Sequence, residues 1–191
     1  MELISPILTK RLKLRLLTKH DAAALHRFRG HQTATRYLSH EPLSVEENSV
    51  RLSEQLAHAE ASTAEWFHLG WAIELRATGE VIGDARAWNS SNPPLPGKIP
   101  ADHAALGYIL HPDHHGSGYG SEAAAALVAW LFGDRGTRTI YAGVYEPNLA
   151  SRKLLETLGF TRDHHFPADQ DSHGKGLPSW RYRLDRPRNM S

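Results

Sequence analysis

The sequence predicts a mixed α/β domain, and three observations support this fold class. Alternating apolar and polar residues near the N-terminus indicate a strand, two apolar segments in the middle indicate a hairpin, and the second half alternates strand and helix patterns. A chain of 191 residues has the length of one domain and can bury a substantial core. We therefore expect a single domain over residues 1–191.

Composition limits the functions that need to be considered. The chain is 40% hydrophobic and 23% charged, which is ordinary for a globular protein. Its formal net charge of +1 gives no electrostatic reason to expect a nucleic-acid partner. The absence of cysteine excludes disulfides, thiolate metal ligands and a cysteine nucleophile. No apolar segment has the length of a membrane span or resembles a signal peptide, so we expect a cytoplasmic protein without a membrane partner.

The 13 histidines do not predict a metal site. Several of them are adjacent in sequence, as in His114–His115 and His164–His165, and adjacent residues on a strand point to opposite faces. The spacings typical of zinc sites are absent from the sequence. We therefore expect no bound metal.

The first half of the chain contains signals for a strand, two helices and a hairpin. In chain order we expect a strand at residues 12–17, a helix from Ala22, a helix from Ser44, and hairpin strands at residues 66–76 and 81–89. Either Thr18 or Asp21 could cap the first helix. Ser44 and Glu47 have the spacing of a capping box, which favours a helix start at that point.

The second half is organised around residues 106–130. Residues 106–110 form a short apolar run that Pro112 ends, and Gly116, Gly118 and Gly120 then lead into an alanine-rich helix. Glycines permit a tight turn, and a helix N-terminus offers unpaired N–H groups, so this loop favours binding of a phosphate or pyrophosphate. A turn without a ligand is the alternative. The spacing does not fit the dinucleotide fingerprint or the P-loop.

The remaining segments complete the α/β pattern. Residues 139–144 predict a strand, residues 148–158 predict a helix with Gly159 at its C-terminal cap, and residues 180–184 predict a last strand. Four prolines between residues 90 and 100 indicate a loop, which could shape substrate access or be a plain connection.

Three segments together resemble one family. LTKRLKLRLLTKHDAAAL resembles an opening of the form T-x-R-L-x-L-R followed by an aspartate. HPDHHGSGYGSEA resembles an acyl-CoA loop, Q/R-x-x-G-x-G/A, with His115 at the Gln/Arg position. NLASRKLLETLGF resembles a late helix that starts N-x-x-S and ends G-F. In this order, they are similar to the GNAT superfamily of acyl-CoA-dependent N-acyltransferases, and in particular to its RimJ/RimL-like branch.

The resemblance implies a fold and a co-substrate. A GNAT-like fold has a splayed, mixed central sheet flanked by helices, and the strand at residues 106–110 would diverge from the strand at residues 139–144. The pantetheine arm of acetyl-CoA would enter this wedge and pair with exposed backbone. The residues implied in binding are Ile109, Leu110 and His111 for the arm, His115, Gly116, Ser117, Gly118, Tyr119, Gly120 and Ser121 for the pyrophosphate, and Asn148 and Ser151 for the thioester end.

Acyl transfer also requires an acid for the leaving thiolate and a base for the attacking amine. Many relatives place a tyrosine acid on the late helix, but the matching residue here is Leu155. The resemblance leaves Ser151 as the hydroxyl that could act on the sulfur.

The base is open. Relatives carry a glutamate at the position of Ala105, and strand alternation places His103 on the same face, so His103 is our first candidate. Further candidates are Asp102, Asp169, Asp171 and His173.

We expect acetyl transfer from acetyl-CoA to a primary amine by direct attack in a ternary complex. The acceptor could be a protein N-terminus, an amino acid or another small-molecule amine, and the protein could be a homodimer. A non-catalytic acyl-CoA-binding module is the alternative, because Ala105 and Leu155 replace two residues that relatives use.

Overall fold

The computed structural model describes residues 4–89, 100, 102–171 and 174–187. The strands are β1 (Ile7–Leu8), β2 (Leu12–Leu16), β3 (His68–Leu75), β4 (Val81–Trp88), β5 (His103–Leu110), β6 (Thr139–Tyr145), β7 (Thr161–Phe166) and β8 (Ser179–Asp185). The α-helices are α1 (Ala22–Arg29), α2 (Gln32–Thr35), α3 (Val45–Glu60), α4 (Tyr119–Gly133) and α5 (Leu149–Thr157). Most of the loop predicted at residues 90–100 lies outside the described residues.

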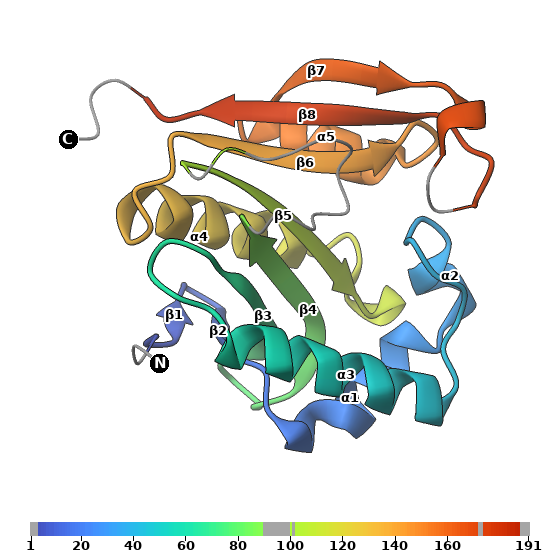
Figure 1. Cartoon of the computed structure of the whole chain (residues 1–191). Coiled ribbons are helices and arrows are strands. Elements are labelled where there is room, and N and C mark those ends of the chain that lie inside the picture. The colour runs from blue at the N-terminus through green and yellow to red at the C-terminus, as the bar shows by residue number, and fades with distance from the viewer. Residues whose placement is uncertain (1–3, 90–99, 101, 172–173, 188–191) are drawn as a thin grey trace.

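A single sheet of eight strands forms the centre of the described chain, in the order β1-β2-β3-β4-β5-β6-β8-β7 (Figure 1). All neighbouring strands are antiparallel except β5 and β6, which are parallel. Helix α4 connects these two strands in sequence, as a parallel pair requires a crossover. The predicted mixed α/β class is therefore confirmed.

Two apolar clusters cover the two faces of the sheet. On one face, Leu127 and Leu131 of α4 and Leu155 of α5 pack with strand residues such as Leu106. On the other face, Leu25 of α1 and Leu52 of α3 pack with Ala72, Ile109 and a few further residues. Alternate strand residues supply the two clusters, so each face has its own layer of helices.

The central strands β5 and β6 diverge. The parallel pairing runs only from His103 to Ala105 on β5, opposite residues 139–141. Beyond Ala105, β5 continues to pair with β4 as far as Leu110, while β6 pairs with β8. Figure 1 shows the resulting wedge between the two strands. The splay that the resemblance implied is thus present, with its closed end at Ala105.

The structure also contains elements that the pattern did not predict, namely β1, α2 and β7. Strand β7 reads Thr-Arg-Asp-His-His-Phe, and its side chains are exposed except for Phe166. It lies at the edge of the sheet and pairs only with β8, so no buried face imposes an apolar alternation on it. Strand β1 and helix α2 are too short for a period to be read.

Candidate functional site: a glycine loop beside a splayed strand pair

The loop between β5 and α4 has the backbone that its glycines predict. Gly116 and Gly118 adopt left-handed conformations, with φ of 76° and 78°, which favour glycine over other residues. Gly118 is the N-terminal cap of α4, and the first helical hydrogen bond joins the Glu122 N–H to its carbonyl at 3.1 Å. The N–H groups of the first helical turn therefore remain available to an anion. Residues 115–118 are exposed, so a ligand can reach them.

Gly120 has a different role from the other two glycines. It is buried, and a Cβ atom there would come within 3.3 Å of Leu154 and 3.4 Å of Tyr108. The absence of a side chain therefore lets α4 approach β5 and α5 closely. The three alternating glycines predicted as one pyrophosphate loop divide into two that shape the loop and one that packs the helix.

Arg11 holds the glycine loop against the N-terminal strands. Its Nε lies 2.6 Å from Glu122 Oε2, and its Nη1 donates to the Ser117 carbonyl at 2.8 Å. The guanidinium also lies over the Tyr119 ring, 4.4 Å from the centroid. Thr9 donates its hydroxyl to the other oxygen of Glu122 at 2.6 Å. These contacts form a clamp of Thr9, Arg11 and Glu122 that fixes the first turn of α4.

The clamp explains part of the N-terminal motif. Burial alone would raise the pKa of the Glu122 carboxyl, but the hydrogen bonds from Thr9 and Arg11 outweigh it and lower the pKa. The second arginine of the motif, Arg15, forms two hydrogen bonds to Asp21 at 2.7 and 2.9 Å and so holds the start of α1. The motif carried a family resemblance but did not predict these contacts, and the Arg11–Glu122 contact joins segments more than 100 positions apart.

The backbone groups predicted to bind the pantetheine arm are not equally available. The His111 N–H donates to the Ile82 carbonyl, and its carbonyl accepts from His114. The carbonyl of Ile109 lies against Gly83 of β4. Strand alternation then directs the backbone of Leu110 and Tyr108 into the wedge. The ring of His115 lies 3.1 Å from the Leu110 carbonyl, so this side chain folds back onto the strand rather than outward.

Tyr108 and Ser151 meet across the wedge. The Tyr108 hydroxyl donates to Ser151 Oγ at 3.3 Å, which links β5 to the helix that follows β6. Ser151 is held in turn by Asn148, whose side chain caps α5 by accepting from the Ser151 N–H at 3.2 Å. Burial raises the pKa of Tyr108, although the bond to Ser151 opposes this, so the phenol keeps its proton. Tyr108 was not singled out from the sequence, where it is one residue of the run at residues 106–110.

His103 lies apart from this pair. It is at the closed end of the wedge, five residues from Tyr108, which corresponds to roughly 17 Å along a strand. By alternation it is on the opposite face of β5 from Tyr108. Its Nδ1 is 3.3 Å from the Tyr141 hydroxyl, and burial lowers its pKa despite the charge of Asp102. The structure therefore brings Ser151, Asn148 and the glycine loop to one face and leaves His103 on the other.

The remaining base candidates lie in different places. Asp102 is 46% exposed and lies within 3.7 Å of His103 and 3.5 Å of Arg138. Asp171 accepts a hydrogen bond from the Tyr145 hydroxyl at 3.0 Å, near the end of β6 and the start of α5. Asp169 is exposed, in a short helical turn, and His173 lies outside the described residues. Among the base candidates that the structure describes, Asp171 is therefore the aspartate next to the end of β6, which borders the wedge.

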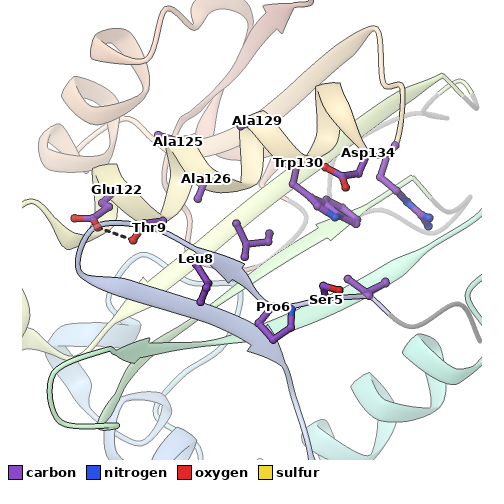
Figure 2. Close-up of a pocket in the computed structure, with 13 residues that line it drawn as sticks. Ser5, Pro6, Leu8, Thr9, Glu122, Ala125, Ala126, Ala129, Trp130 and Asp134 are labelled. Atoms are coloured by element: carbon purple, nitrogen blue, oxygen red, sulfur yellow. Dashed lines mark hydrogen bonds between the residues drawn. The ribbon is translucent and has the colours of Figure 1, made fainter.

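A cavity of about 780 Å³ lies elsewhere, along the outer side of α4 (Figure 2). Its lining includes small side chains of α4, such as Ala125 and Ala129, opposite Leu8 of β1. Glu122 of the clamp is at one end, and neither Ser151 nor the glycines belong to it. The chemistry-bearing residues therefore surround the wedge rather than this cavity.

Comparison with known proteins agrees with this geometry. The family model described as "Acetyltransferase (GNAT) domain" matches residues 11–161. YoaA of Bacillus subtilis, described as an uncharacterized N-acetyltransferase, is 31% identical over 163 residues, which cover 83% of this chain and 84% of YoaA.

Solved structures show the same fold. A GNAT-family acetyltransferase from Bacillus anthracis superposes with a TM-score of 0.78 at 18% identity, over 94% of this chain and 98% of that one. The aminoglycoside acetyltransferase AAC(6')-Ib in complex with coenzyme A superposes with a TM-score of 0.72 at 20% identity, over 92% and 95% of the two chains. None of the helices in the described part of the chain is long and apolar enough to span a bilayer. From its sequence and its splayed sheet together, this chain belongs to the GNAT acetyltransferase family.

Proposed function

We propose that the protein transfers an acetyl group from acetyl-CoA to a primary amine by direct attack in a ternary complex. The Tyr108–Ser151 hydrogen bond carries this proposal, because it places two hydroxyl groups across the wedge between β5 and α5. The glycine loop and the N-terminus of α4 lie at the open end of the same strand and fit the pyrophosphate.

The residues fit the demands of acyl transfer. The amine nitrogen attacks the thioester carbonyl, the carbon–sulfur bond breaks, and the sulfur requires a proton or a hydrogen bond. Ser151 donates a hydrogen bond to the sulfur, the thiolate takes a proton as it leaves, and the base takes one from the amine nitrogen, while Tyr108 orients Ser151 by donating to its oxygen. Burial raises the pKa of Tyr108, so the phenol keeps its proton and remains a hydrogen-bond donor. The amine also needs a base. His103 is the candidate at the closed end of the wedge, and Asp171 is the candidate near the end of β6.

Assignment to the RimJ/RimL-like branch, cytoplasmic location and a homodimeric state remain predictions from the sequence. The non-catalytic module also remains a distinct alternative. Ala105 and Leu155 are apolar, so neither position offers an ionisable group to the wedge, and both side chains are buried in the core. The Tyr108–Ser151 pair favours the enzyme, since a protein that only binds acyl-CoA has no need of an oriented hydroxyl beside the thioester sulfur.

Thermal unfolding with acetyl-CoA, combined with an amine panel, tests the proposal. At a concentration 100 times the dissociation constant, a ligand adds about 2.7 kcal/mol of stability, or roughly 5–10 °C in Tm for a chain of this size. Free thiol should then appear only when a suitable amine is present. An unchanged Tm would contradict the proposed coenzyme site. A raised Tm without thiol release for any amine would instead support the non-catalytic binding module.

A further inference from the structure

A cluster of basic side chains lies on the sheet face covered by α1 and α3. Arg86 of β4 alternates with Ala85 and Ala87, which pack on the α4 side, so its side chain points the other way. Arg51 comes from α3, and its neighbours in the cluster are His40, before α3, and His68 of β3. All four side chains are partly buried, and this group of Arg51, Arg86, His40 and His68 with the space beside it is called the recess below.

Acidic side chains neutralise only part of the positive charge of this cluster. Asp84, two residues before Arg86, lies 2.7 Å from Arg29 and forms a buried pair with it. Arg51 and Arg86 have no hydrogen bond or ion pair to another described residue. Burial and the neighbouring arginines lower the pKa of Arg51 to about 10 and lower that of Arg86, although Asp84 attracts both guanidinium groups and Glu54 attracts Arg51. Arginine keeps its charge in proteins, so the cluster carries an excess of positive charge.

The positive charge of the cluster also affects the pKa values of its two histidines. Burial, reinforced by nearby arginines, lowers the pKa of His40 and of His68 to about 4. Both imidazoles are therefore neutral at pH 7 and do not add to the charge. Neutral His68 can still offer a ring N–H to a ligand, whereas the single N–H of neutral His40 is donated to the Glu41 carbonyl.

Four buried donors in this part of the molecule also have no hydrogen-bond acceptor among the described residues. They are Arg29 Nη1, Gln55 Nε2, Arg86 Nε and Trp88 Nε1. The side-chain oxygen of Gln55 accepts a hydrogen bond from Arg29 at 2.8 Å, so the amide N–H groups of Gln55 point away from Arg29. Buried polar groups in native proteins are nearly always satisfied. An anionic ligand would satisfy such donors, one of which belongs to the charged Arg86.

The recess adjoins the wedge. Arg86 is paired in register with Gly107 of β5, and a Cβ atom on Gly107 would have nothing closer than the Trp88 ring at 3.9 Å. Space therefore remains beside the Arg86 side chain. Gly107 also lies beyond Ala105, the last residue of β5 that pairs with β6, so this space is at the point where the wedge opens. A molecule bound over Gly107 can place one end among the arginines and the other toward the thioester.

We propose that the acetyl acceptor is an amine that carries a carboxylate, and that Arg51 and Arg86 bind this carboxylate. The inference rests on the proposed acetyl transfer and names its substrate class. A guanidinium presents parallel N–H groups that match the two oxygens of a carboxylate. Trp88 Nε1 and the Gln55 amide supply further donors to the same group. An acceptor whose only charge is its amine would instead be repelled.

Matched acceptors test the substrate class. Each of a set of free amino acids is compared with its carboxamide, which keeps the amine and the side chain but lacks the negative charge. We expect kcat/KM for the free acid to exceed that for the amide by about 100-fold or more, because only the acid can form ion pairs with the partly buried guanidinium groups of Arg51 and Arg86. Amides that react as well as the free acids would overturn the proposal.

Variants connect this preference to the recess. Arg86→Met and Arg51→Met should reduce the ratio of acid to amide toward one, mainly through KM, while Arg86→Lys should retain part of it because charge remains without the fork. Lys19→Met, which removes an exposed cation in the turn before α1, is the matched control and should leave the ratio unchanged. A ratio that persists in both arginine variants would place the carboxylate elsewhere.

A binding measurement separates this inference from the proposed activity. N-acetyl amino acids and their amides are titrated calorimetrically into the whole protein with coenzyme A present, so that no turnover is needed. We expect the N-acetyl acids to bind and the amides to bind at least about 100-fold more weakly, with the difference lost in Arg86→Met. Selective binding without acetylation of any amine would retain the anion site and reject the enzyme. Equal binding of acid and amide would reject the anion site alone.

Discussion

The two faces of the sheet offer anions two different kinds of partner. On the α4 face, the groups are backbone N–H donors from one short segment, residues 116–121, because the predicted donor of His115 is used on the Pro112 carbonyl. Gly118 of this segment is in a left-handed conformation at the helix start. On the α3 face, they are side chains from separate elements, with Arg51 on α3 and Arg86 on β4. The first arrangement is local and depends on glycines, whereas the second exists only when the chain is folded.

The comparison shows how each type of site is held in place. Backbone donors on the α4 face carry no net charge, and the Arg11–Glu122 ion pair fixes the loop from outside. Charged donors on the α3 face cost desolvation free energy on folding, and nearby Arg29 is stabilised by Asp84 with both side chains almost fully buried. We therefore expect changes on the α3 face to affect stability and changes in the glycine loop to affect binding.

The largest expected effect is on the stability of the α3 face. Arg29→Met removes the partner of Asp84, whose side chain is only 3% exposed, and leaves a buried charge unpaired. We expect a loss of about 3–5 kcal/mol in the free energy of unfolding, measured by urea denaturation. Arg27→Met on the same helix is the control, because the Arg27–Glu80 pair is largely exposed and should contribute no more than about 1 kcal/mol. Equal losses in the two variants would remove the special role of the buried pair.

The next effect is on coenzyme binding at the α4 face. Gly118→Glu places a charged side chain at a left-handed position where the pyrophosphate should lie. Like charges at a binding site cost several kcal/mol, so acetyl-CoA affinity measured by calorimetry should fall by at least about 100-fold. Gly133→Glu adds the same charge at the other end of α4, where a Cβ atom would meet nothing within 4 Å. Retained affinity in Gly118→Glu would place the phosphates elsewhere.

The smallest expected effect concerns the chemistry between the two faces. Ser151→Ala should lower kcat by about 10- to 1000-fold, with little change in coenzyme affinity, because a hydroxyl that assists the leaving thiolate acts in the transition state. Tyr108→Phe removes the donor to Ser151 without moving the ring and should reduce kcat less than Ser151→Ala. Measured with chemistry as the slow step, an unchanged kcat in Ser151→Ala would make Ser151 an ordinary helix residue and direct the search for the acid to Tyr108 itself.

Local signals in the sequence were sufficient for the elements that carry the coenzyme loop. The proline after β5, the glycines and the alanine-rich run predict the strand, turn and helix, because each acts through backbone conformation within a few residues. The capping box at Ser44 and Glu47 is confirmed by its two hydrogen bonds for the same reason. Asn148 likewise caps α5, as the predicted helix start required.

The contacts between distant segments required the tertiary structure. The clamp of Arg11 on Glu122 and the meeting of Tyr108 with Ser151 depend on strand order and on the splay of β5 from β6. The family resemblance at Ala105 and strand alternation together marked His103 as a base, but alternation gives a face and not a distance, and the structure places His103 at the closed end of the wedge. The recess of Arg51 and Arg86 could not be predicted from the sequence either, because a single arginine in a sequence is most often a solvated surface charge. Only packing of α1 and α3 on the sheet brings these two charges together and shields them from water, since burial and proximity are properties of the folded chain.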